Sequence, residues 1–177
     1  SLFGQLVIIT LIQIGGLGVI TVAVAFSLLS GKKVSLMQRS FMQESVSAPV
    51  VGGIVRLTGF ILKGTFIIEL SGALLMMPVF CKDYGLKGIW FAIFHSISAF
   101  CNAGFDLMGA FGMSSFTGYN TNWVVCVTLM ALILIGGIGF FVWSDLKEHK
   151  LHFRKYALHT KIVLVTSVIL AVVPTIL

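Results

Sequence analysis

Long apolar runs dominate the chain, and polar or basic segments separate them. Four runs reach or approach the ~20 apolar residues that a helix needs to cross a bilayer. They cover residues 3–29, 54–80, 122–143 and 161–177. The regular apolar–polar alternation of membrane β-barrels is absent from the sequence. The pattern therefore predicts an all-α integral membrane protein.

Composition and charge agree with this prediction. Hydrophobic residues make up 58% and charged residues 10% of the chain, whereas soluble domains carry roughly 25% charged residues. The net charge of +6 could suggest nucleic acid, but nine of the twelve Lys and Arg residues fall within 31–56 and 144–161, which join apolar runs. This is the positive-inside pattern. We therefore expect cytoplasmic basic segments, residues 81–121 on the extracellular side, and no nucleic-acid partner.

The expected extracellular segment contains a short apolar stretch, "GIWFAIFHSISAF" at 88–100. As a helix it would be roughly 20 Å long, which is less than the ~30 Å hydrocarbon core of a bilayer. Both of its flanks must lie outside, so we expect a re-entrant hairpin in which the helix descends partway and the chain returns extended. Non-helical backbone at that depth is tolerated where it is buried in protein or lines a water-filled path.

An internal repeat organises the rest of the chain. "LIQIGGLGVIT" at 11–21 and "LILIGGIGFFV" at 132–142 align without gaps. Both copies lie in runs expected to descend from the outer side, which predicts a parallel repeat rather than an inverted one. The shared glycines suit close helix packing in lipid or a wall beside a pore, and the two uses are compatible; they are Gly15, Gly16, Gly18, Gly136, Gly137 and Gly139.

The residues after the short helix have the chemistry of an ion filter. A helix that ends near Phe100 points the negative end of its dipole into the membrane, where it stabilises a cation. Backbone carbonyls can replace the hydration shell of an ion, and Gly104 permits the positive φ that such a segment needs. The predicted filter consists of Cys101, Asn102, Ala103, Gly104 and Phe105. The alternative is a purely structural plug.

Several polar residues surround this predicted filter. His95, Ser96 and Ser98 on the short helix are expected to pack behind it rather than to titrate. Glu69 lies well inside the second apolar run, where acids face the protein interior; it serves either ion-path electrostatics or a structural hydrogen bond. Asp106 either draws cations to the filter or is a solvated loop acid.

Other features limit the possible functions. "SLMQRSFMQESVSAP" at 35–49 has a Ser–x–x–Gln capping box and favours a short interfacial helix, or a loop without membrane contact. The cysteines are too widely spaced for a zinc site or a disulfide framework, and no enzyme motif is present. The chain begins without Met and stops inside an apolar run, so we expect a piece of a longer protein.

The quoted segments, together with "FGQLVIITLIQIGGLGVIT", "HSISAFCNAGFDLMG" and "HTKIVLV", resemble the membrane subunit of the Ktr/Trk/HKT superfamily of potassium transporters, and most nearly the bacterial KtrB type. The resemblance implies four units around one pore, each with a first helix (M1), a pore helix with its filter (P) and a second helix (M2). Residues 1–30 would then be M2 of unit one, 54–143 unit two, and 157–177 the start of unit three.

Within unit two, the resemblance implies M1 at 54–80, the pore helix at 88–100, the filter at 101–105 and M2 at 122–143. Cytoplasmic linkers would occupy 31–53 and 144–156.

The same resemblance implies function and partners. We expect potassium uptake, with or without dependence on sodium, by a homodimer in the plasma membrane. A cytosolic nucleotide-binding ring of the RCK type is the expected partner, with 31–39 and 145–161 as candidate contacts. Membrane lipids surround the protein; no covalent cofactor is expected, and nucleotide belongs only to the ring. The alternatives are a sodium/solute symporter, which predicts inverted repeats, and a scaffold that transports nothing.

Overall fold

The computed structural model describes residues 1–18, 21–22, 54–111, 115–150 and 152–176. Every regular element in these ranges is a helix, and none is a strand. The interfacial helix predicted within 35–49 lies outside the described residues. The all-α prediction is confirmed for the part of the chain that the structure describes.

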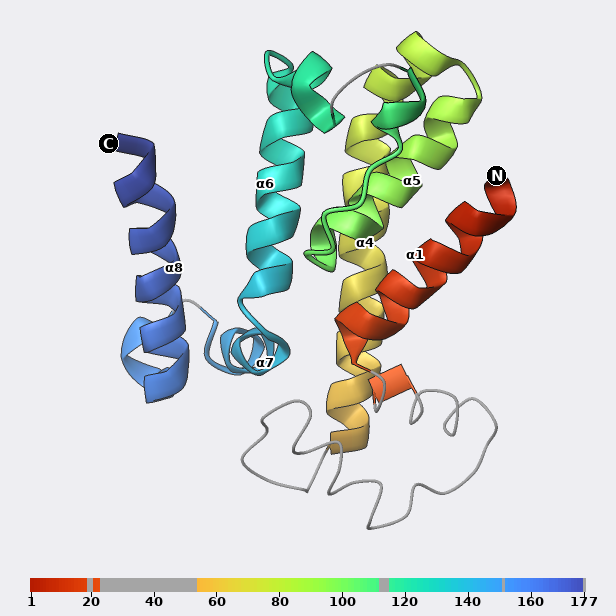
Figure 1. Ribbon diagram of the computed structural model, residues 1–177. Coiled ribbons are helices and arrows are strands. Elements are labelled where there is room, and N and C mark those ends of the chain that lie inside the picture. The colour runs from red at the N-terminus through yellow and green to blue at the C-terminus, as the bar shows by residue number, and fades with distance from the viewer. Residues whose placement is uncertain (19–20, 23–53, 112–114, 151, 177) are drawn as a thin grey trace.

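A long helix and a short one form the centre of the fold (Figure 1). Helix α4 (Ile54–Tyr84) continues past the expected end at residue 80, and its part from Leu57 to Tyr84 is long and apolar enough to cross a membrane. The chain then reverses at Gly85, where φ is +59°. Helix α5 (Lys87–Phe100) runs back along α4. Close approach at the turn requires a glycine, because a side chain at Gly88 would collide with the backbone of α4 at Phe80.

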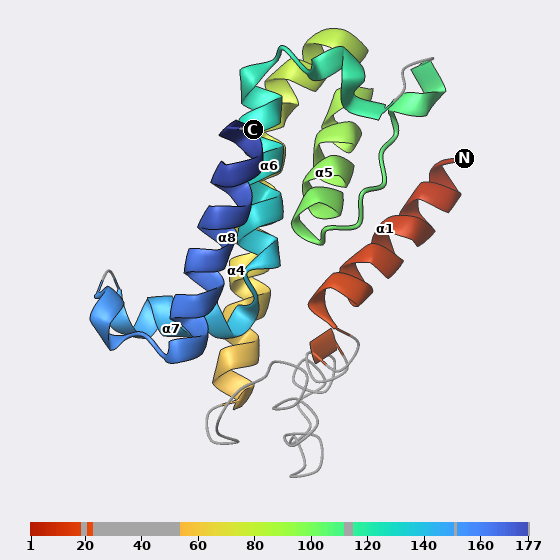
Figure 2. The same cartoon turned by 60° about the vertical axis from the view of Figure 1, so that its left-hand side comes forward.

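Helices α1 (Leu2–Leu17) and α6 (Trp123–Gly137) contain the two copies of the glycine-rich repeat, and both pack against α5. Figures 1 and 2 show that these two helices run in the same direction, from the end near the N-terminus toward the end that holds α7. This arrangement agrees with a parallel repeat. The inverted repeat expected of the symporter alternative would place the two copies in opposite directions.

The third apolar run is not one continuous helix, which corrects the expected helix over 122–143. Helix α6 ends at Gly137, and α7 (Phe140–His149) leaves it at an angle of 91°. Gly139 lies between them with φ 87° and ψ 150°, a region that is essentially restricted to glycine. The chain therefore bends within the run that the sequence predicted as one span.

The first apolar run is interrupted in the same way. Helix α1 ends at Leu17, earlier than expected for the run 3–29, and Gly18 follows with φ 81° and ψ 132°. Gly18 and Gly139 occupy the same position in the two copies of the repeat. The repeat thus specifies a helix end as well as a packing surface.

Helix α8 (Leu158–Ile176) follows α7 through a short 3₁₀ turn, η3 (Phe153–Lys155), and lies beyond α6. By length and composition, α4 is the one helix of the described ranges that could cross a membrane alone. The bent pair α6–α7 would be a second span, while α1 and the apolar part of α8 are shorter. The four apolar runs expected as spans are thus not all unbroken long helices in the described ranges.

The main core lies where α4, α5 and α6 meet. Its buried side chains include Met76 and Phe80 from α4, Phe91 and Phe100 from α5, and Val125 from α6. Two 3₁₀ turns, η1 (Met108–Phe111) and η2 (Ser115–Tyr119), cover the end of this core near the α4–α5 turn. This packing fixes α5 and therefore the segment that follows it.

Candidate functional site

The segment from Cys101 to Leu107 turns at Cys101 and Asn102, where φ is −75° and +54°, and then returns along α5 toward the end where α5 began (Figure 2). Its first residues still bond to the end of α5: the N–H of Ala103 donates to the carbonyl of Ser98 at 2.9 Å. The side-chain amide of Asn102 donates to the Ile133 carbonyl of α6 at 3.3 Å. The residues predicted as a filter thus form one short strip along α5, in which Asn102 bonds to α6 and Ala103 packs against the cluster of Ile9, Ile12 and Phe94.

The backbone carbonyls of this strip differ in whether they accept a hydrogen bond. Those of Cys101, Asn102, Ala103 and Gly104 accept no hydrogen bond from any described residue. The carbonyl of Phe105, also predicted as part of the filter, accepts the hydroxyl of Ser98 at 2.6 Å. Gly104 has φ +74°, with open space where a side chain would begin. Within the described part of the chain, four unpartnered carbonyls therefore follow directly after the C-terminal end of α5.

His95 holds the far end of the strip. Its Nδ1 lies 2.8 Å from the carbonyl of Phe91, so this nitrogen must carry a proton and donate. Its Nε2 accepts the backbone N–H of Leu107 at 3.0 Å. Both contacts are satisfied together only by the neutral ring protonated at Nδ1. His95 is 1% exposed, and it packs edge-on against Phe116 with ring centroids 4.7 Å apart.

Ser96 points away from the strip, unlike His95 and Ser98. Its hydroxyl donates to the backbone carbonyl of Glu69 on α4 at 2.6 Å. The Glu69 carboxylate accepts the side-chain amide of Gln13 on α1, at 3.0 and 3.2 Å for its two oxygens. It also lies 3.9 Å from the thiol of Cys101. Sequence reasoning identified Glu69 but missed Gln13, a polar residue inside an apolar helix.

Asp106 is half-buried and caps the turn that follows the strip, since its carboxylate accepts the N–H of Met108 at 2.8 Å. With His95, Asn102 and Gly104 it lines a cavity of about 290 Å³ between α5, η2 and α6. Asp106 is therefore neither a fully solvated loop acid nor an isolated charge. No group of three or more His, Cys, Asp and Glu side chains within the described ranges could hold a metal ion.

Comparison with known proteins decides the family. The model of a family described as cation transport protein, TrkH, matches residues 1–176. The chain belongs to the TrkH family of cation transport proteins. Membership of this family agrees with two predictions from the sequence, that the chain is part of a membrane protein and that it is not an enzyme.

Three curated relatives extend the comparison. The TrkH-family chain is 39% identical to the potassium/sodium uptake protein NtpJ of Enterococcus hirae, over 96% of this chain and 37% of that protein. It is 38% identical to the Ktr system potassium uptake protein B of Bacillus subtilis, with the same coverage. It is 32% identical to the protein of that name from Vibrio alginolyticus, over 100% and 38%. The chain thus spans little more than a third of the length of these relatives.

The repeat glycines of this TrkH-family chain have different surroundings. A side chain at Gly16 would meet the Cβ of Cys101 at 2.7 Å, and one at Gly136 would collide with the carbonyl oxygen of Phe100. A Cβ at Gly15 would have no described atom within 4 Å, and one at Gly137 would have only the Asn102 amide, at 3.7 Å. One glycine of each copy therefore lets its helix approach the end of α5, while Gly18 and Gly139 provide the bends.

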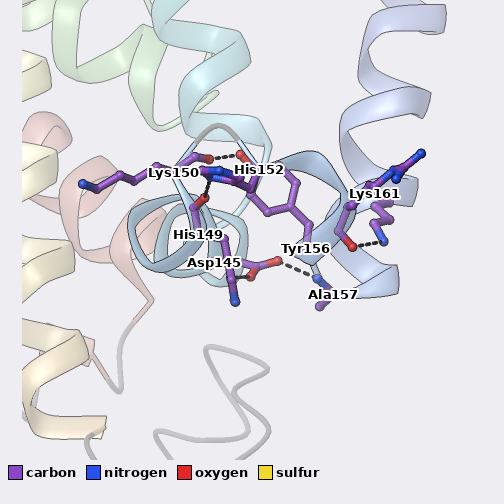
Figure 3. A network of polar contacts seen from close by, with 8 residues as sticks. Asp145, His149, Lys150, His152, Tyr156, Ala157 and Lys161 are labelled. Carbon is purple, nitrogen blue, oxygen red and sulfur yellow. Dashed lines mark hydrogen bonds and ion pairs between the residues drawn. The ribbon is translucent and has the colours of Figure 1, made fainter.

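A polar corner joins α7 to α8 (Figure 3). The carboxylate of Asp145 accepts the N–H of Ala157 at 2.9 Å, just before α8 begins, and lies 2.8 Å from Nδ1 of His149. Burial alone would raise the pKa of Asp145, but the Thr160 hydroxyl, the Ala157 N–H and His149 stabilise its charge and lower the pKa below the ordinary value. The hydroxyl of Tyr156 closes the corner by donating to the carbonyl of Lys150.

Proposed function

We propose that this chain forms part of the ion path of a potassium uptake system, with or without dependence on sodium. The observation that carries the proposal is the row of four carbonyls from Cys101 to Gly104, which have no partner among the described residues. These carbonyls follow the C-terminal end of α5, where the helix dipole favours a cation. Carbonyl oxygens in such a row can replace the water around an ion during its passage. Membership of a cation transport family supports the same function.

In this proposal α4, α5 with its strip, and α6 are the M1, P and M2 elements of one unit, and α1 and α8 belong to the units on either side. Helix α5 and the strip form a re-entrant hairpin, and both ends of this hairpin lie on the extracellular side. The basic segments 31–56 and 144–161 then face the cytoplasm, in agreement with the positive-inside rule. One strip cannot surround an ion, so the other units must supply the remaining carbonyls.

The proposal includes partners beyond this chain. Relatives are named as parts of a Ktr system, and a system implies more than one component. We propose a homodimer in the plasma membrane that works with a cytosolic nucleotide-binding ring, for which 31–39 and 145–161 are candidate contacts. Potassium and sodium are cargo in this scheme, and nucleotide binds the ring rather than this chain.

The experiment replaces Gly104 in the full-length protein, expressed in a bacterium that lacks its own potassium uptake. Gly104→Asp should abolish growth at low potassium, and Gly104→Ser should lower the preference for potassium over sodium, because side chains rarely adopt φ +74°. Gly109→Ser is the matched control, since Gly109 is exposed, lies in the same outer segment and has no positive φ. Unchanged rubidium uptake and ion preference in both Gly104 variants would exclude this strip as the filter.

A further inference from the structure

Gln13 and Glu69 form a polar pair in a groove between α1 and α4. The groove has a volume of about 450 Å³ and is otherwise mainly apolar, with Ile14, Leu17 and Phe66 among its lining residues. Glu69 is only 7% exposed. A buried carboxylate in a membrane protein is costly, so its presence requires a specific reason.

A second groove, between α6 and α8, is the counterpart of the first. The gap-free alignment of the glycine-rich copies puts Gln13, Ile14 and Leu17 opposite Leu134, Ile135 and Ile138, and these three residues line the second groove. Helices α4 and α8 also align without gaps when the fully buried Thr58 and Thr160 are matched. This alignment puts three residues of the first groove opposite three that line the second: Leu62 with Leu164, Phe66 with Val168, and Glu69 with Ala171.

The two grooves therefore share their lining positions but not their chemistry. Leu134 and Ala171 stand where the first groove has Gln13 and Glu69, and the second groove is almost wholly apolar. These two lining positions can thus be occupied by apolar side chains in this fold. Packing alone does not explain why the first groove contains a carboxylate and an amide.

The first groove differs in what lies next to it. The Glu69 carboxylate is 3.9 Å from the thiol of Cys101, the first residue of the strip, and its backbone carbonyl accepts the Ser96 hydroxyl of α5 at 2.6 Å. Glu69 does not line the cavity that contains Asn102 and Gly104. Gln13 donates to both of its carboxylate oxygens. The carboxylate therefore faces α1 and the start of the strip rather than the row of carbonyls.

We infer that Glu69 and Gln13 are positioning residues, which fix the start of this strip against the neighbouring unit and so set ion preference without touching the ion. This inference rests on the proposed function, because it assumes that the strip is a filter. The pair acts through hydrogen bonds: Gln13 holds the carboxylate, the carboxylate holds Cys101, and Ser96 ties α5 to the same residue of α4.

The test gives the first groove the residues of the second. It uses the full-length protein with the double variant Gln13→Leu and Glu69→Ala, which introduces the side chains found at Leu134 and Ala171. Rubidium uptake, its KM and maximal rate, and inhibition by sodium are measured in the uptake-deficient bacterium. The double variant should reach the membrane at the parent level, because the two side chains that it introduces already line the second groove. Its preference for potassium over sodium should fall about fivefold, the factor that corresponds to one lost hydrogen bond.

Two further variants separate positioning from general packing and from charge. Gln5→Leu removes another hydrogen bond between α1 and α5, from Trp90 to Gln5 at 2.8 Å, at the opposite end of α5 from Cys101; it should leave ion preference at the parent value. Glu69→Gln keeps an acceptor for Gln13 and Cys101, so it should retain most of the preference that the double variant loses.

Three results would overturn the inference: an unchanged preference in the double variant, an equal loss in Gln5→Leu, or a loss in Glu69→Gln as large as that in the double variant. Absence of rubidium uptake by the parent protein would instead contradict the proposed function. The two failures are therefore distinguishable in the same assay.

Discussion

The Nε2 atom of His95 accepts the backbone N–H of Leu107 at 3.0 Å, so a side chain of α5 holds the end of the extended strip. Ser98, one turn further along α5, holds the carbonyl of Phe105. Both anchors act from the side of the strip that faces α5. The strip is therefore fixed at its end by side chains and at its start by the close approach of two glycine-containing helices.

The first prediction concerns His95. His95→Ala should destabilise the full-length protein by about 1–3 kcal/mol, because it leaves the N–H of Leu107 without its acceptor. Thermal unfolding of the detergent-purified protein measures the loss. His152→Ala is the control, since the His152 side chain is exposed and contacts a backbone carbonyl three residues away, that of His149. Equal unfolding temperatures for His95→Ala and the parent would contradict this role.

The second prediction concerns the glycines that face α5. Gly136→Ala should cost about 1–3 kcal/mol through overpacking, because the atom in its way is the backbone oxygen of Phe100, which cannot rotate aside. Gly137→Ala adds the same methyl one residue later, where the nearest atom is 3.7 Å away. Membrane level and rubidium uptake should therefore fall in the first variant and not in the second. A similar loss in both would show that glycine is needed for another reason.

The sequence predicted the short helix well because its signals are local. An apolar stretch too short to span a membrane lies between polar flanks, and the observed helix, Lys87–Phe100, differs by one residue from the expected 88–100. The shared direction of the two repeat copies also followed from the sequence, since the basic segments determined it. These features depend on the order of residues along the chain and not on distant contacts.

The bends and the polar pair were not predicted, for physical reasons. A glycine inside an apolar run can serve close helix packing or a change of chain direction, and the sequence alone does not distinguish the two. The positive φ of Gly18 and Gly139 was therefore not predicted. Gln13 and Glu69 are 56 positions apart, and their contact depends on how α1 meets α4. Comparison of the two copies carried a usable signal, because Gln13 stands where the second copy has Leu134.

The third prediction concerns the bend at Gly139. Gly139→Ala should destabilise the protein by about 1–3 kcal/mol, since alanine strongly disfavours φ 87° with ψ 150°. The control is Gly59→Ala, in the interior of α4 with no described atom within 4 Å of the added methyl; it should be neutral or slightly stabilising, because alanine favours helix. Thermal unfolding of both variants measures the difference. A harmless Gly139→Ala would mean that the 91° bend does not depend on this glycine.

The last prediction concerns the corner between α7 and α8. Asp145→Ala should cost roughly 0.5–2 kcal/mol, because the N–H of Ala157 at the start of α8 loses its cap. The lowered pKa of Asp145 fixes the pH dependence: the stabilisation is fully present above the ordinary value of 3.8 and is lost as pH falls through the lower folded-state value. Unfolding temperatures of the parent and the variant should therefore differ at neutral pH and converge in acid. Glu148→Ala, which removes an exposed acid from the same helix, should match the parent at neutral pH; a gap between parent and Asp145→Ala that grows as pH falls would contradict the assignment.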